Sequence, residues 1–152
     1  MTVVLDVKDL RTYFYTEYGE VKAADGVSFH INQGEVVGLV GESGCGKSVS
    51  ILSAMQLIQS PGKIVSGTIN FEGKDLRSFK PNGPEMRAIR GSRMTMIFQE
   101  PMTSLNPVLS ICRQMTETLE LHLDMDRDSA RARAIELLRL VGLDEYCMDR
   151  YP

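Results

Sequence analysis

Eight consecutive residues in the first third of the chain have the types and spacing needed to hold a chain of phosphates. In order they are Gly41, Glu42, Ser43, Gly44, Cys45, Gly46, Lys47 and Ser48, which match the pattern GxxxxGK[ST]. Glycine lets the backbone turn tightly, so that successive N–H groups point at phosphate oxygens. A helix that begins here adds the positive end of its dipole. The sequence therefore predicts a phosphate-binding loop rather than a glycine-rich turn without a ligand.

The side chains of this loop predict distinct roles. The ammonium of Lys47 is expected to reach the β- and γ-phosphates and to serve catalysis, and the Ser48 hydroxyl is expected to bind Mg²⁺. The other expected nucleotide contacts come from Gly41, Ser43, Gly44, Cys45 and Gly46. Cys45 lies among backbone N–H groups that favour an anion, so it is expected to be the reactive thiol of the chain. The alternative for Cys45 is a small, inert side chain packed beneath the loop.

The segments around the loop indicate how it is positioned. Val36–Val40 is apolar on both faces, which is typical of a central parallel strand covered on each side. A helix is expected from Gly46-Lys47 to about Gln59, where Pro61-Gly62 follows. Its apolar stripe comprises Ile51, Met55 and Ile58, with Leu52 and Ala54 beside it. A second buried strand is expected at Met94–Phe98. A strand, a loop and a helix in this order imply an α/β architecture.

The remaining segments divide into a β-rich first part and a helical last part. Strands are expected at Val3–Val7, Thr12–Thr16, Val27–Ile31 and Ile64–Glu72, with Ile69 and Phe71 on one face of the last. A turn is expected at Asn32–Gly34, and a loop with a short helix at Lys80–Ser92. Asp128 is expected to cap a helix through Val141 that stops at Gly142. The expected apolar face of that helix comprises Ala134, Leu137, Leu138 and Val141.

Composition excludes several classes of protein. The net charge of −3 lacks the basic surplus of a nucleic-acid binder. The apolar runs are far shorter than the roughly 20 residues that a membrane span needs. The N-terminus lacks the features of a secretory signal, so a cytosolic protein is expected. Three separated cysteines form no CxxC pair, and therefore predict neither a disulfide framework nor a zinc site.

Two stretches resemble the nucleotide-binding subunits of ABC transporters, specifically those of oligopeptide and dipeptide importers. The first reads VKAADGVSF over 21–29 and continues through Gly34-Glu35 into the loop. The second reads IFQEPMTSLNP over 97–107 and resembles the family's Q-loop and the segment after it almost residue for residue. The resemblance covers essentially the whole chain, and the second stretch narrows it to the peptide class. It implies ATP with Mg²⁺ as the ligand.

The resemblance also implies roles for residues outside the loop. Gln99 is expected at a strand end, where its amide reaches Mg²⁺ or the attacking water, and Glu100–Pro107 is expected to face an integral-membrane permease subunit. Without the resemblance, Gln99 would be an ordinary exposed residue. Phe14 is the expected aromatic residue that stacks on adenine, with Tyr13 and Tyr15 as neighbouring alternatives. Strand aromatics otherwise pack across strands.

The implied fold is a RecA-like P-loop NTPase core with an N-terminal antiparallel β subdomain and the start of an α-helical subdomain. We expect 1–35 and 63–79 in the β subdomain, 36–62 and 93–99 in the core, and 107–152 in the helical subdomain. Only two parallel-strand candidates occur, so the sheet is expected to be incomplete. The family's LSGGQ-like signature, Walker B glutamate and switch histidine are not in these 152 residues.

The implied function is that of an ATP-binding subunit at the cytoplasmic face of the plasma membrane, which pairs with a second such subunit and drives import of peptides or similar solutes. A P-loop kinase or GTPase is a weaker alternative, because no NKxD segment occurs and the β-rich start fits neither class. ABC ATPases of DNA repair or translation are disfavoured by residues 97–107. Taken alone, these residues are expected to bind nucleotide without turnover.

Overall fold

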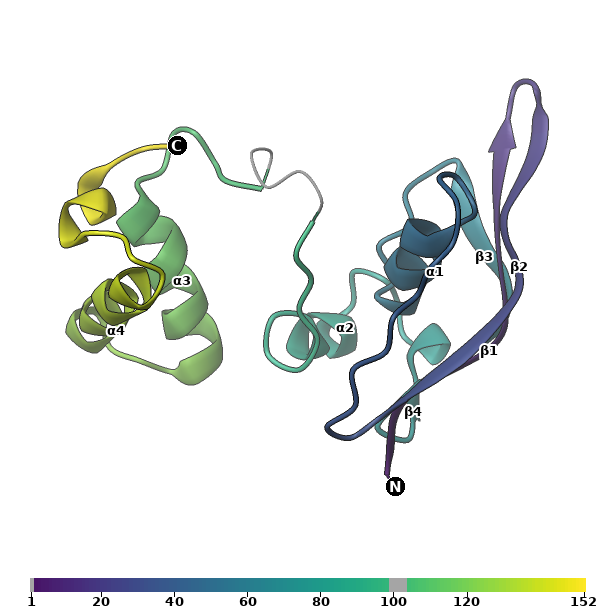
Figure 1. Ribbon diagram of the computed structural model, residues 1–152, viewed down its shortest axis with the longest axis horizontal. Helices are drawn as coiled ribbons and strands as arrows, with labels where there is room; N and C mark the ends of the chain where they lie inside the picture. The colour runs from purple at the N-terminus through teal and green to yellow at the C-terminus, as the bar shows by residue number, and fades with distance from the viewer. Residues whose placement is uncertain (1, 99–103) are drawn as a thin grey trace. The chain divides into compact units, whose positions relative to one another are not determined.

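The structure is a computed structural model that describes residues 2–98 and 104–152 (Figure 1). The chain forms two compact units, Met1–Arg90 and Gly91–Pro152. Each unit has its own packed interior, and each is described below by itself. The expected grouping of 36–62 with 93–99 into one core stays a prediction, because these two stretches belong to different units.

The first unit is built on an antiparallel sheet in the order β2-β1-β3-β4. Its strands are β1 (Val3–Thr16), β2 (Gly19–Asn32), β3 (Gly62–Phe71) and β4 (Lys74–Asp75). The four β segments expected for this sheet lie within β1, β2 and β3, apart from the terminal residue Glu72, but the two expected near the N-terminus are parts of one 14-residue strand. Residues 19–26 of β2 were not expected to form a strand. The long hairpin of β1 and β2 extends beyond the other strands (Figure 1).

One face of this sheet carries the core of the first unit. Alternation along the strands places Leu5, Val7, Leu10, Ile69 and Phe71 inside, each less than a tenth exposed. Three further buried apolar side chains of this unit come from the short helices η1 (Leu76–Ser78) and α2 (Pro84–Ile89), namely Leu76, Met86 and Ile89. The predicted shared face of Ile69 and Phe71 is confirmed, and so is a short helix within 80–92.

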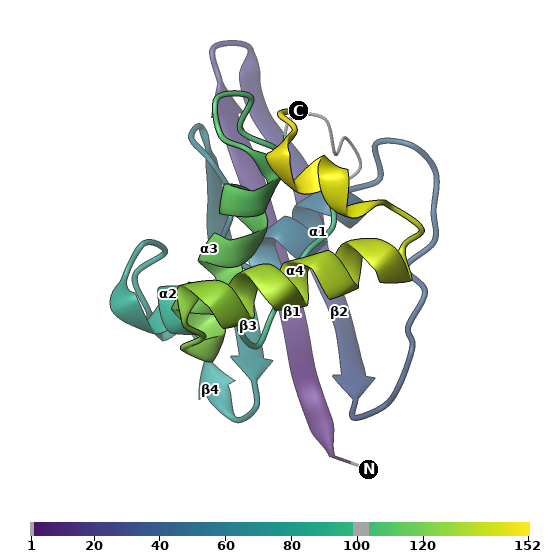
Figure 2. The same ribbon diagram turned by 90° about the vertical axis from the view of Figure 1, so that its left-hand side faces the viewer.

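Helix α1 (Lys47–Ala54) lies on one face of the sheet (Figures 1 and 2). It begins where the sequence predicts, but the expected extension to Gln59 is wrong. Gln56 adopts a left-handed backbone conformation with φ of 52°, and its side-chain amide donates to the carbonyl of Leu76. An α-helix cannot continue through that conformation. Of the expected apolar set, Ala54 in the helix and Met55 just after it are buried, but the helix also buries two small polar residues, Ser50 and Ser53.

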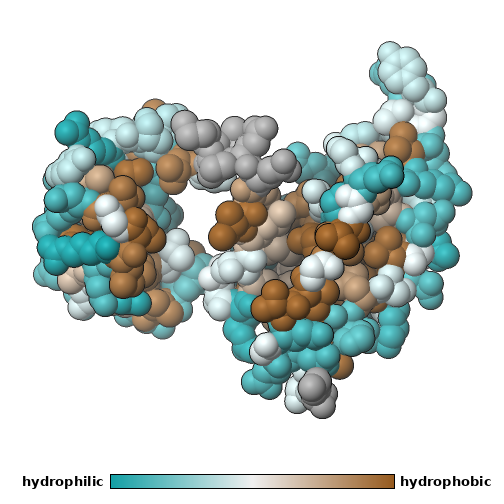
Figure 3. Space-filling model, viewed as in Figure 1, coloured by the Kyte–Doolittle hydropathy of each residue, from teal (hydrophilic) through white to brown (hydrophobic). Residues whose placement is uncertain are grey.

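Both segments expected to be buried parallel strands differ from the prediction. Neither Val36–Val40 nor Met94–Phe98 belongs to a strand of the described sheet. Val36 is 98% exposed, Val40 is 90% exposed and Ile97 is 96% exposed. A strand requires a hydrogen-bonded neighbour, and no described strand of the sheet pairs with either segment. Val36–Val40 belongs to the first unit, on whose surface Figure 3 shows apolar side chains.

The second unit is helical. Its elements are α3 (Ile111–Leu123), α4 (Arg127–Leu140) and the short helix η3 (Glu145–Asp149). They enclose a core of Leu119, Ala130, Ala134, Leu138 and Met148. Gly142 ends α4 with a φ of 78°, as predicted.

Two details of α4 differ from the prediction. The residue that caps the helix is Asp126, whose Oδ1 accepts from the N–H groups of Asp128 and Ser129 at 3.1 and 3.0 Å, so the predicted Asp128 cap is wrong by two residues. Val141 is exposed, because it follows the last helical turn and leaves the buried face. Among the described residues, no helix combines the length and apolarity that a bilayer crossing would require.

Candidate nucleotide-binding site

The segment Gly41–Ser48 lies in the first unit, between the extended stretch after β2 and the start of α1. Gly44 and Gly46 have φ values of 82° and 90°, a region that residues with a Cβ rarely adopt. The pattern of glycines in the sequence thus coincides with the backbone conformation that a tight, N–H-lined loop requires.

Gly46 is held against strand β2. A Cβ added at this position would lie 2.0 Å from the carbonyl oxygen of Ala23. That distance is far below any van der Waals contact, so only glycine fits between the loop and the strand. Glycine is therefore required at position 46 for two reasons: the left-handed backbone conformation, which the motif implies, and the close approach of the Ala23 carbonyl.

The N-terminus of α1 offers backbone donors for an anion. Gly46 is the N-cap and supplies no side-chain hydrogen bond, and the first turn carries no acidic residue. The first N–H groups of an α-helix have no acceptor within the helix. Together with the helix dipole, they fit a phosphate group in front of Lys47. The Ser50 hydroxyl donates to the Gly46 carbonyl at 2.9 Å and so ties the loop to the first turn.

The ammonium of Lys47 lies over the loop and contacts three acceptors. Its Nζ donates to the carbonyl oxygens of Gly41 and Glu42 at 2.7 and 2.6 Å, and lies 3.5 Å from the Sγ of Cys45. An ammonium has three protons, so these contacts account for all of its donors. Exchanging carbonyl acceptors for phosphate oxygens would replace neutral partners by charged ones, which make stronger hydrogen bonds.

Most other residues of the loop are exposed to solvent. Gly41, Ser43, Gly44, Cys45 and Ser48 are all exposed. The thiol of Cys45 is therefore accessible, which removes the alternative of a buried filler. The described residues include no group of three or more His, Cys, Asp and Glu side chains that could hold a metal. The exposed Ser48 hydroxyl fits Mg²⁺, which usually keeps several waters and takes few ligands from the protein.

Phe14 lies on the same side of β1 as α1. Its ring is half-buried and lies close to Gly62, which the Ile58 side chain also approaches, in the segment that follows the helix. Tyr13 points to the opposite face, where its hydroxyl donates to Asp25, and Tyr15 shares that face by the alternation of the strand. This placement favours Phe14 over its two neighbours, although stacking on adenine stays a prediction.

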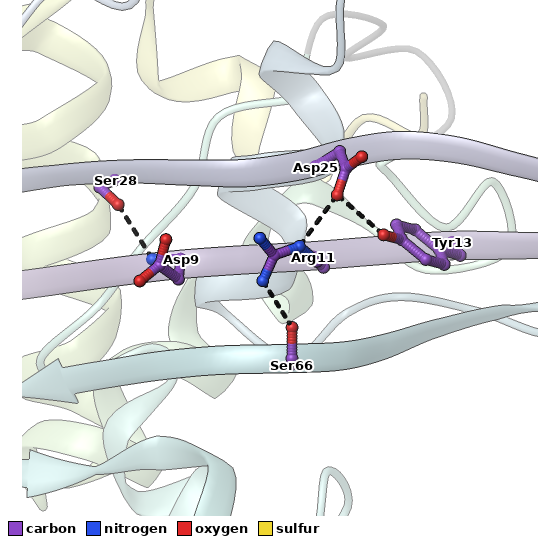
Figure 4. Close-up of polar contacts among 6 residues, drawn as sticks. All are labelled: Asp9, Arg11, Tyr13, Asp25, Ser28 and Ser66. Carbon is purple, nitrogen blue, oxygen red and sulfur yellow. Dashed lines mark hydrogen bonds and ion pairs between the residues drawn. The ribbon is translucent and has the colours of Figure 1, made fainter.

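The opposite face of the hairpin carries a polar network (Figure 4). The Arg11 guanidinium donates to Asp25 at 3.0 Å and to Ser66 at 3.3 Å, and the Tyr13 hydroxyl donates to Asp25 at 2.8 Å. The hydrogen bond from Tyr13, followed by that from Arg11, holds the pKa of the Asp25 carboxyl below its usual value. The same bond to Asp25 raises the pKa of Tyr13. The network joins β1, β2 and β3 through Arg11, Asp25 and Ser66. Asp25 is two residues after Ala23, which contacts the loop at Gly46.

The expected Q-loop cannot be placed in the site. Gln99 lies outside the described residues, as do 100–103 of the segment expected to contact a permease. The last residues of that segment are described: the Asn106 carbonyl accepts from the Gln114 side chain at 3.0 Å, and the Asn106 N–H donates to the same side chain at 2.8 Å. These bonds join the segment to helix α3.

Sequence comparisons assign the chain to a family. The model of the family described as "ABC transporter" matches residues 24–151. The chain is 52% identical to the oligopeptide transport ATP-binding protein AppD of Bacillus subtilis (strain 168), over 100% of this chain and 47% of that protein. It is 41% identical to the dipeptide transport ATP-binding protein DppD of Escherichia coli (strain K12), over 98% and 46% respectively. The chain thus spans about half the length of these curated relatives, and it belongs to the ABC transporter family.

Comparison with solved structures supports the fold. The dimeric structure of MJ0796, a bacterial ABC transporter cassette, matches with a TM-score of 0.82 at 23% identity, over 97% of this chain and 61% of that one. A second structure of MJ0796, bound to ADP and phosphate in a post-hydrolysis state, matches with a TM-score of 0.78 at 24% identity. The fold class predicted from the sequence, an incomplete P-loop NTPase of the ABC type, is therefore confirmed.

Sequence reasoning missed the contacts that hold α1 on the hairpin. Ala23 touches the loop at Gly46, and Thr12 of β1 touches Ser53 of α1. The available signals were two small residues in succession, Ala23-Ala24, and two serines three residues apart in a helix. Small residues allow a close approach of helix and strand, but the sequence does not show which strand the helix approaches.

Proposed function

We propose that the chain is the ATP-binding part of a subunit that drives import of peptides or similar small solutes through an ABC transporter. The observation that carries the proposal is the loop Gly41–Ser48, in which left-handed glycines, open N–H groups of α1 and the Lys47 ammonium converge. The peptide class is supported by relatives named for oligopeptide and dipeptide transport. In the proposed assembly the subunit works at the cytoplasmic face of the membrane, beside a permease subunit and a second ATP-binding subunit.

The proposed role of each residue follows from the chemistry of its side chain. Lys47 neutralises the β- and γ-phosphates, Ser48 contributes a hydroxyl to Mg²⁺, and Phe14 stacks on the base. Mg²⁺, when bound, neutralises charge on the phosphates. Gln99 is proposed to sense the γ-phosphate, and 100–107 to contact the permease. Phosphoryl transfer depends on positioning and on charge stabilisation, so these residues alone are proposed to bind ATP without turning it over.

Calorimetric titration with ATP·Mg²⁺ tests the proposed binding. Lys47→Ala should remove charge-assisted contacts worth about 1.5–3 kcal/mol, which corresponds to a roughly 10- to 150-fold weaker complex. Lys63→Ala is a matched control, because it removes a lysine of the same unit that lies on β3. Equal affinity of the two variants would show that Lys47 does not contact the phosphates. Lys47-dependent steady-state turnover near 1 s⁻¹ would contradict binding without hydrolysis.

The transport assignment needs a separate experiment. A chimera in which residues 1–152 replace the matching part of the Bacillus subtilis relative AppD should restore oligopeptide uptake to a strain that lacks this subunit, and the same chimera with Lys47→Ala should not. A chimera that is present in normal amounts at the membrane but supports no uptake would contradict the peptide assignment.

A further inference from the structure

Two buried hydroxyl groups join β1 to α1. Thr12 Oγ1 and Ser53 Oγ lie 2.7 Å apart, and both residues are completely buried. The Ser53 hydroxyl also lies 2.7 Å from the carbonyl oxygen of Val49, to which it donates. A hydroxyl has one proton, so Ser53 accepts from Thr12 while it donates to Val49. The result is a directed chain of hydrogen bonds from the strand to the first part of the helix.

This chain of hydrogen bonds lies between the two parts of the proposed nucleotide site. Val49 is two residues after Lys47, in the turn that follows the phosphate-binding loop. Thr12 is two residues before Phe14 on β1, so the two side chains share the face toward α1. Beside Thr12 in the sheet is Ala24, and the preceding residue, Ala23, touches Gly46 of the loop.

The pair is poorly explained as a packing feature alone. Buried hydroxyls contribute less than apolar groups of the same size unless they are hydrogen-bonded, and removing one partner leaves the other unsatisfied. Valine has nearly the shape of threonine and a higher hydrophobicity, and alanine is the better helix former at the position of Ser53. A directional bond between the elements is what threonine and serine provide and these residues do not.

We infer that Thr12 and Ser53 are positioning residues that fix the strand carrying the base-stacking aromatic relative to the phosphate-binding loop. The inference rests on the proposed function, because it assumes that ATP contacts both β1 and the loop. A ligand that spans two elements binds tightly only when the elements are held at the right separation, since flexibility between them must otherwise be lost on binding. A bare polyphosphate contacts the loop alone and does not depend on that separation.

The distinguishing experiment compares ATP·Mg²⁺ with tripolyphosphate·Mg²⁺ by calorimetric titration of the 152-residue chain. Thr12→Val keeps the shape and removes the donor, so it should weaken ATP binding by about 3- to 10-fold and leave tripolyphosphate binding within about twofold of the starting protein. Thr12→Ser, which retains the hydroxyl, should restore ATP affinity. Thr16→Val is the matched control on the same strand, since the Thr16 hydroxyl donates to Gly19 in the hairpin turn.

Further outcomes separate this inference from the proposed function. If Thr12→Val weakens both ligands equally, or neither, the positioning role is wrong even though the chain binds ATP. If the unchanged chain binds no ATP, the proposed function fails, and the inference fails with it. Ser53→Ala should reproduce the effect of Thr12→Val, and the double variant should be no weaker than either single variant, because both remove the same bond. Additive losses would overturn the inference.

Discussion

The segments before and after residue 41 differ in how firmly they are attached to the sheet. On the C-terminal side, the loop and α1 are fixed by the contact of Gly46 with Ala23 and by the bond between Thr12 and Ser53. On the N-terminal side, Val36–Val40 has no strand beside it in the described sheet, and two of its valines are almost fully exposed. The comparison shows that the loop Gly41–Ser48 is positioned by the helix after it, which packs on the hairpin, and not by a strand before it.

Gly46→Ala is the change expected to damage this docking most. The new methyl group would overlap the Ala23 carbonyl, and alanine would have to adopt a φ of 90°. Gly34→Ala is a matched control, because Gly34 has a φ of 74° but nothing lies within 4 Å of its added Cβ. Gly46→Ala should cost at least about 1 kcal/mol more than the control in the free energy of unfolding, and should abolish ATP binding. If chemical denaturation gives the same loss of unfolding free energy for both variants, the Ala23 carbonyl does not exclude a side chain at position 46.

Cysteine labelling compares the loop with the helical unit. Cys45 is exposed and lies in the loop, whereas Cys112 and Cys147 are half-buried. Brief maleimide treatment followed by peptide mapping should modify Cys45 first, by several-fold, and ATP·Mg²⁺ should slow that reaction. The prediction is wrong if the label falls mainly on Cys112 or Cys147, or if nucleotide leaves the rate at Cys45 unchanged.

The polar network behind the hairpin predicts a modest dependence of stability on pH. The folded-state pKa of Asp25 is lowered, so its contribution is present above about pH 4 and is lost as the pH falls through the lowered value. The pKa of Tyr13 is raised, so its contribution is present below about pH 10 and is lost as the pH rises through the raised value. Asp25→Asn should reduce both the acid and the alkaline dependence of the melting temperature on pH, measured by thermal unfolding from pH 3 to 11. The same dependence on pH in the variant and the starting protein would exclude a stabilising role for this network.

The smallest effect is expected in the apolar run before the loop. Val36→Ser and Val40→Ser should each change the free energy of unfolding by less than about 0.5 kcal/mol, because both side chains are already in water. Both substitutions remove exposed apolar surface, so they should also reduce aggregation and the binding of an apolar dye to the protein. Val7→Ser, in the buried face of β1, is the matched comparison and should cost more than about 2 kcal/mol. A comparable loss at Val36 would show that this run is packed after all.

The local features of the chain were determined by its sequence. The glycines and lysine of Gly41–Ser48 specify the loop, because backbone conformation and helix start depend on residues close in sequence. The same holds for parts of the hairpin strands, namely Val3–Val7, Thr12–Thr16 and Val27–Ile31, for the buried pair Ile69 and Phe71, and for the stop at Gly142. Alternation is a local pattern and predicted the strand segments, whereas the helical pattern after Gly46 predicted a longer helix than α1.

Tertiary structure decided everything that depends on a distant partner. An apolar run such as Val36–Val40 is a strand only if another strand pairs with it, and the run contains no information about that neighbour. Helix α1 ends before Gln56, which has a φ of 52° and whose side chain donates to the carbonyl of Leu76, twenty residues away. The bond between Thr12 and Ser53 spans 41 residues for the same reason, since which hydroxyls meet is decided by how a helix docks on a sheet and not by the residues around each one.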